Sequence, residues 1–178
     1  MRRFRNCSEW RGWTMAALVG GLLLRAATGA HAQTFCLEHV NDSLGVLTLT
    51  TDSTIDRREV PFPVYRFCTG DLNGDGLDEA LLGVVKPTRF FPQPARRLFI
   101  FKNVHGRIRP LWLGSKLGGT LLDFRLSGPL IVCLATDGKG RYYVMEYELG
   151  KFGLNFRRYL AEGAGEEEAS RAFDGGRQ

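Results

Sequence analysis

The sequence has few of the residues and none of the motifs on which most catalytic sites depend. It contains 3 His and 4 Cys in 178 residues. It has no CxxC, H-E-x-x-H, G-x-S-x-G, P-loop or GxGxxG motif. Because nucleophilic and metal-assisted catalysis need a positioned base or a ligand cluster, we expect a non-enzymatic protein. The alternative is a secreted enzyme or enzyme-accessory domain whose site these motifs do not identify.

The sequence also lacks an apolar run of the ~20 residues that cross a bilayer, so we expect no stable membrane insertion. Residues 1–32 instead combine an Arg-rich start, a short apolar stretch at 14–24 and the small-residue site Ala30-His31-Ala32. This order is typical of a signal peptide that is cleaved before Gln33. The sequence therefore predicts a secreted or periplasmic protein.

The net charge of +5 does not indicate a nucleic-acid-binding protein, because the excess is concentrated in the predicted signal peptide. Residues 1–32 hold five arginines against Glu9, which leaves +1 for residues 33–178. Nucleic-acid-binding domains carry their positive charge on the folded surface. We therefore expect no nucleic acid among the partners.

Three cysteines remain after residue 32, which is an odd number for an oxidising compartment. Cys133 lies in the apolar run 129–135 and is expected to be a buried strand thiol. Cys36 and Cys68 are the better candidates for a bridge, and a bridged and a free pair remain equal alternatives.

Short β-rich segments separated by turn signals fill the chain after the signal peptide. We expect strands at residues 46–50, 60–67, 79–85, 98–104, 109–113, 120–125, 130–135, 142–149 and 156–160. The prolines of 60–67 favour an outer strand there, as do the charges of 156–160, whereas the continuous apolar runs 79–85 and 130–135 favour central strands. Residues 161–178, which include three consecutive glutamates, are expected to form a disordered acidic tail.

A weak internal repeat favours two similar units. One begins at Asp71 and closes at Trp112, and the other begins at Asp123 and closes near Tyr159. Each has the length of a four-stranded propeller blade, and a partial blade at 46–67 precedes them. The predicted fold class is all-β, with antiparallel blade-like sheets that resemble a partial β-propeller of two to three blades.

The segment from Gly70 to Ala80 contains the one motif with definite chemistry. Side-chain oxygens at Asp71, Asn73, Asp75 and Glu79 alternate with spacers, and Leu77 adds a backbone carbonyl. Calcium prefers six to eight oxygen ligands, which a tight loop of this kind can supply. The sequence therefore predicts a Ca²⁺ site at these five residues, against the alternative of a glycine-rich turn without metal.

The loop is not an EF-hand, because Leu82 stands where that motif needs a bidentate Glu and the next segment has a strand pattern. It resembles instead the FG-GAP or VCBS repeat, which occurs in the β-propellers of integrin α-chains and in many bacterial exported proteins. The resemblance implies that residues 33–160 form an FG-GAP-like β-domain with a calcium loop between two strands. No ligand series follows Asp123, so it implies no metal in the second unit.

A chain of this length cannot supply the seven blades usual in that family. Three arrangements remain: a fragment-like sheet domain, a homo-oligomer that completes a ring, or an open stack with capped edges. The resemblance implies a binding or adhesion module for a protein or glycan ligand. The Pro- and Arg-rich insertion 86–97, with Phe90 and Phe91, is either its recognition surface or a segment folded back onto a blade.

Overall fold

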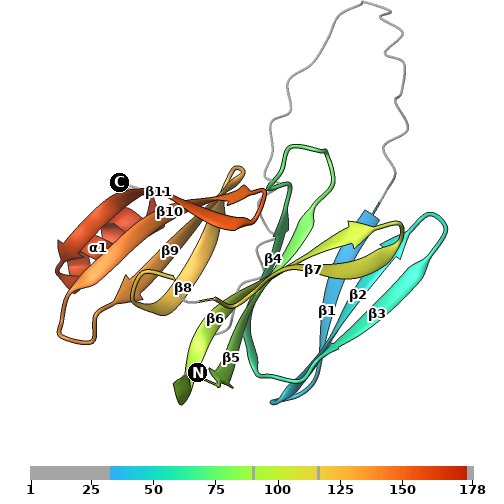
Figure 1. Cartoon of the computed structure of the whole chain (residues 1–178), viewed down its shortest axis with the longest axis horizontal. Helices are drawn as coiled ribbons and strands as arrows, with labels where there is room; N and C mark the ends of the chain where they lie inside the picture. Colours follow the sequence, from blue (N-terminus) through green and yellow to red (C-terminus); the bar gives the residue numbers. More distant parts are fainter. Residues whose placement is uncertain (1–32, 90, 116, 176–178) are drawn as a thin grey trace, which may run out of the picture.

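The computed structural model describes residues 33–89, 91–115 and 117–175 (Figure 1). The predicted signal peptide and Phe90 lie outside these ranges. None of the helices in the described ranges is long and apolar enough to cross a membrane.

Within the described residues, eleven strands form three antiparallel sheets, and each sheet is a meander whose strands follow one another in the sequence. The first sheet contains β1 (Gln33–Asn41), β2 (Leu44–Thr51) and β3 (Ile55–Val60). The second contains β4 (Val64–Gly70), β5 (Glu79–Thr88), β6 (Phe91–Val104) and β7 (Arg107–Leu113). The third contains β8 (Thr120–Ser127), β9 (Leu130–Thr136), β10 (Tyr142–Gly150) and β11 (Gly153–Ala164), and helix α1 (Glu166–Asp174) follows.

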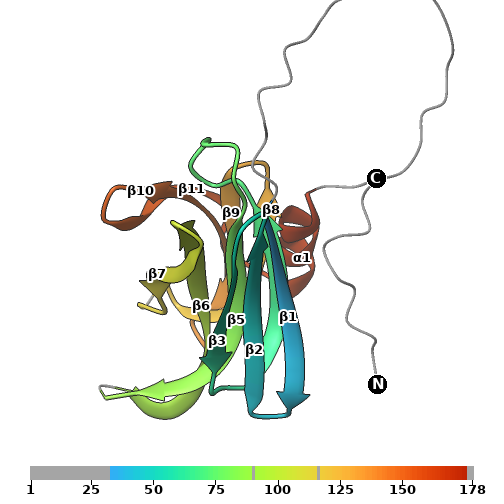
Figure 2. The same cartoon turned by 90° about the vertical axis from the view of Figure 1, so that its right-hand side faces the viewer.

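The three sheets stack face to face in chain order, and α1 covers the far face of the third (Figures 1 and 2). The prediction of an all-β fold with blade-like antiparallel sheets is confirmed, and none of the sheets closes into a barrel. Within the chain the stack is open: it begins with a solvent-facing surface of the first sheet and ends under helix α1.

Two apolar cores hold the stack together. Leu47, Leu82 and Phe101 belong to the core between the first and second sheets. Leu81 and Phe124 belong to the core between the second and third. Because Leu81 and Leu82 point to opposite faces of β5 and are both fully buried, the second sheet is covered on both sides.

The strand order agrees with the predicted positions of the central runs. Residues 79–85 lie in β5 and residues 130–135 in β9, and both strands are central in their sheets. Residues 156–160 lie in the edge strand β11, as expected. The predicted strand 60–67 is wrong as a single strand, because Pro61 and Pro63 interrupt it and divide it between the edge strands β3 and β4.

The prediction of a disordered tail from residue 161 is wrong for the described residues. Residues 161–164 complete β11, and α1 then buries Ala169 and Phe173 beside Val132 and Val144 of the third sheet. The signal was the i, i+4 spacing of these two apolar residues behind an acidic first turn, which suits the positive end of a helix dipole. Gly175, with a φ of 82°, ends the helix in the left-handed conformation that glycine favours.

The repeat alignment through Asp71 and Asp123 is also wrong in register. Asp71 follows β4, whereas Asp123 lies inside β8, the strand at the corresponding position of the next sheet. The true repeat is the four-stranded meander. The Asp123 carboxylate accepts a hydrogen bond of 2.5 Å from Arg66 of β4. This ion pair joins the second and third sheets.

Among the described residues Cys36 and Cys68 do not form a disulfide with each other, so the alternative of a Cys36–Cys68 bridge is not realised. Cys36 is exposed, whereas Cys68 is buried in the core between the second and third sheets. The core between the first two sheets therefore separates the two thiols. Cys133 is fully buried in β9, as expected, and burial raises the pKa of its thiol.

The replacement Phe173→Ala tests whether α1 belongs to the fold. Removing this buried ring leaves a gap over Val132 and Val144. We expect the free energy of unfolding to fall by about 3 kcal/mol in chemical denaturation. The control Arg171→Ala, on the exposed side of the same helix, should change it by less than about 0.5 kcal/mol. Equal stability of Phe173→Ala and wild type would contradict the docking of α1.

Candidate metal centre

The five predicted ligands lie on one loop, between the edge strand β4 and the central strand β5. Gly70 and Glu79 are paired across the two strands, so the ladder fixes both ends of the loop. Gly74 and Gly76 have φ values of 78° and 83°, which side chains with a Cβ rarely adopt. The two glycines therefore allow the chain to turn tightly enough to bring alternate side chains together.

Asp71 anchors the loop through backbone N–H groups. Its Oδ1 accepts a hydrogen bond from the Gly74 nitrogen at 2.7 Å, and its Oδ2 accepts one from the Gly76 nitrogen at 2.9 Å. The bond from Gly76 is the largest of the causes that lower the pKa of this carboxyl. Asp71 is therefore ionised at neutral pH in the folded protein.

Asn73 and Asp75 continue the same pattern. The Asp75 nitrogen donates to Oδ1 of Asn73 and the Leu77 nitrogen donates to Oδ1 of Asp75, each at 2.8 Å. Such side-chain-to-backbone turns wind the chain so that successive side-chain oxygens remain near one another. The Asn73 amide also donates to Oδ2 of Asp75 at 3.0 Å and to Oε1 of Glu79 at 2.8 Å.

Glu79 is the buried member of the set, with only 2% of its surface exposed. Its Oε2 accepts a hydrogen bond from the Leu72 nitrogen at 2.9 Å. Burial raises the pKa of this carboxyl to about 7, and the charges of Asp75 and Asp71 add to the rise. Among the described residues no ion pair neutralises Glu79, so ionisation places a poorly compensated negative charge at the base of the loop.

These features fit a calcium ion in charge and ligand type. Asp71, Asp75 and Glu79 supply carboxylates, Asn73 an amide oxygen and Leu77 a carbonyl oxygen, all of them hard donors. The described residues contain no group of three His, Cys, Asp or Glu side chains already gathered as a metal cluster. Calcium ligation also requires that Asn73 present its oxygen, rather than its NH₂ group, to the two carboxylates.

The loop is linked to the rest of the molecule through two amide side chains that sequence reasoning missed. Gln33 of β1 donates from Nε2 to the Asp78 carbonyl oxygen at 2.7 Å, and its Oε1 accepts from Asn103 of β6 at 2.8 Å. Asn103 accepts in turn from the Gly106 nitrogen of the β6–β7 turn at 2.7 Å. No sequence signal marked these residues, because neither belongs to a motif.

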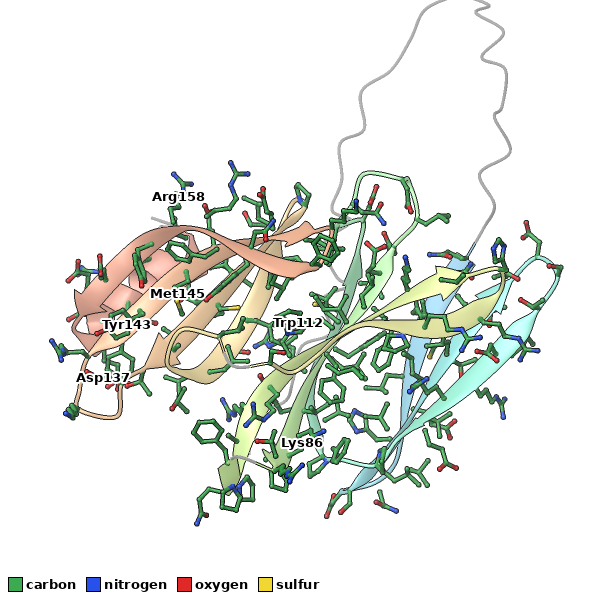
Figure 3. The ribbon with its side chains drawn as sticks, in the orientation of Figure 1. Lys86, Trp112, Asp137, Tyr143, Met145 and Arg158 are labelled. Atoms are coloured by element: carbon green, nitrogen blue, oxygen red, sulfur yellow. The ribbon has the colours of Figure 1, made fainter. Side chains whose placement is uncertain are left out.

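Four side chains of the types used in acid–base catalysis lie apart: His39, His105, Asp123 and Asp137. His39 and His105 are both exposed, and in the described ranges neither imidazole is hydrogen-bonded to a carboxylate or hydroxyl. Asp123 is paired with Arg66. Asp137 lies in the β9–β10 turn at the far end of the third sheet, where it is paired with Arg141 at 3.0 Å (Figure 3).

Comparison with protein families, with curated proteins and with solved structures finds no significant match. The resemblance to the FG-GAP and VCBS repeats therefore remains a prediction from the loop residues and the strand pattern.

The raised pKa of Glu79 predicts a pH dependence of stability in calcium-free buffer. The folded state holds this proton to about pH 7, whereas the unfolded chain releases it near the ordinary value of 4.5. Stability should therefore decrease as the pH rises between these values and level off above them. Denaturation midpoints at pH 5, 6, 7 and 8 should show this decrease for wild type and a flatter profile for Glu79→Gln.

The control for this experiment is Asp78→Asn, which changes an exposed carboxyl of the same loop. It should retain the wild-type profile. Parallel profiles for wild type and Glu79→Gln would contradict the assignment of the buried carboxyl to this titration.

Proposed function

We propose that the protein is an exported, non-enzymatic calcium-binding β-repeat module of the binding or adhesion type. The observation that carries the proposal is the loop in which Glu79, buried and without an ion pair to any other described residue, feels the charges of Asp71 and Asp75. Three carboxylates on one short loop repel one another, and a divalent cation offsets that repulsion.

The proposed role of calcium is structural. The bound ion would supply positive charge and a fixed geometry to a loop that is otherwise held by glycine turns and by hydrogen bonds between its own side chains and backbone. Glu79 lies in the central strand β5, and the Asp78 carbonyl is bonded to Gln33 of β1. A rigid loop would therefore strengthen the junction between the first and second sheets.

The hairpin of β5 and β6 supports a binding role for the segment 86–97. Next to it, between the hairpin and the start of β8, lies a cavity of about 330 Å³ whose lining includes Phe91, Pro94 and Leu121. Phe91 is 49% exposed, while the Lys86 ammonium lies 4.7 Å from the centre of the Phe62 ring at the base of the hairpin (Figure 3). A rigid sheet that presents an aromatic residue beside a cavity with both apolar and polar lining suits a protein or glycan ligand.

Calcium should raise the melting temperature of the protein, and Asp75→Ala should remove this effect. A ligand at one hundred times its Kd stabilises the folded state by about 2.7 kcal/mol, which is several degrees for a domain of this size. The measurement is a thermal melt in 2 mM EDTA and in calcium at about one hundred times the fitted Kd.

Asp78→Ala is the matched control, because it removes a carboxylate from the same loop but keeps the five proposed ligands. It should retain most of the calcium response. Identical melting of wild type with calcium and with chelator would refute the calcium site.

A further inference from the structure

A second charged feature lies on the edge strands β3 and β7, which run side by side along one rim of the first two sheets. Four arginines there form what we call the arginine cluster: Arg57, Arg58, Arg107 and Arg109. Together with Asp56 and Ile108 they line a surface depression of about 360 Å³. One carboxylate against four guanidinium groups leaves a local charge of +3, although residues 33–178 carry only +1 in total.

The cluster differs from the other arginines of the described ranges in how its side chains are engaged. Eight other arginine side chains contact a carboxylate or a backbone carbonyl oxygen, at positions 66, 96, 97, 125, 141, 157, 158 and 171. Arg57, Arg58 and Arg109 have no hydrogen bond or ion pair to another described residue, and all three lie at this depression. Unpaired arginines are therefore gathered in one place.

Two contacts hold part of the cluster in position before any ligand arrives. The Asp56 carboxylate accepts from Arg107 at 3.0 Å and from the Ile108 nitrogen at 2.8 Å. The Arg58 guanidinium lies 5.4 Å from the centre of the Phe101 ring. The hydrogen bond from Ile108 is the largest cause of the lowered pKa of Asp56, so this carboxyl is ionised and does not release Arg107 at neutral pH. Preorganised groups lose less conformational entropy when they bind.

We propose that the arginine cluster binds the sulfate or phosphate ester groups of an anionic glycan. Guanidinium groups present paired N–H donors that match a tetrahedral oxyanion, and several on one rigid rim match repeated esters along a chain. The proposal extends the binding role proposed above, but it does not depend on the calcium loop.

The lining of the depression favours a glycan over two other polyanions. Bases of single-stranded nucleic acid stack on exposed aromatic rings, and the lining contains none. A bilayer surface is entered by exposed apolar side chains, and the one apolar residue of the lining, Ile108, is buried. A sugar chain that carries sulfate or phosphate esters needs neither exposed aromatic rings nor exposed apolar side chains on its binding site.

The test is the binding of heparin, as a sulfated glycan, to the full chain by titration calorimetry at low ionic strength. The double variant Arg57→Gln/Arg109→Gln removes two unpaired charges of the cluster. We expect it to bind heparin about tenfold more weakly. The control Arg157→Gln/Arg171→Gln removes the same charge from exposed positions on β11 and α1, and should bind within about twofold of wild type.

Two further measurements distinguish specific binding at the arginine cluster from non-specific electrostatic attraction. Arg58→Lys keeps the charge but loses the paired donors, and should also weaken binding. Wild-type affinity should fall as salt is raised, and inorganic phosphate should compete. Melting curves of each variant confirm that it remains folded.

Heparin binding that is absent in wild type, or equally strong in the two double variants, would overturn the proposal. Binding to vesicles that contain anionic phospholipid, without binding to heparin, would overturn the choice of a glycan. Asp75→Ala should bind heparin as wild type does. If calcium has no effect on melting but heparin binding depends on the cluster, the calcium proposal fails and this one stands.

Discussion

The burial of the second sheet on both faces is the constraint on which the rest of the structure depends. An antiparallel meander with one apolar face is unstable in water until another layer covers that face. The first and third sheets each cover one face of the second, so Leu81 and Leu82 are both excluded from solvent. The third sheet then needs a cover of its own, and α1 supplies it with Ala169 and Phe173. Within one chain the three sheets and α1 therefore form an open stack.

The same constraint raises the pKa of Glu79 in the candidate metal centre. Because β5 is central and covered on both sides, the strand that begins at Glu79 carries this carboxyl into the protein. Burial and the nearby charges of Asp71 and Asp75 disfavour its ionised form. The arginine cluster has the opposite origin, because β3 and β7 are edge strands whose side chains meet at the rim with little to cover them.

Local pattern was sufficient to predict most of the strands, the central positions of 79–85 and 130–135, and the sharp turn at Gly74 and Gly76, but it missed β1 and nearly all of β3. It failed where the decisive contact was distant in sequence. The helix after residue 165 has one weak sequence signal, the spacing of Ala169 and Phe173, and its 9 residues are too few and too polar to be stable until a sheet face covers them. The link from Gln33 to Asn103 joins residues 70 positions apart, and the pairing of Arg66 with Asp123 depends on which sheets stack.

An amide-resolved calcium titration by nuclear magnetic resonance tests most directly whether the loop between β4 and β5 binds calcium. The nitrogens of Gly74 and Gly76 donate to Asp71, whereas Lys139 donates to Asp137 in a similar turn without further ligands. If the loop binds calcium, the Gly74 and Gly76 signals shift with one saturating curve and the Lys139 signal stays in place. Unshifted glycine signals at millimolar calcium, or equal shifts at Lys139, would contradict the account.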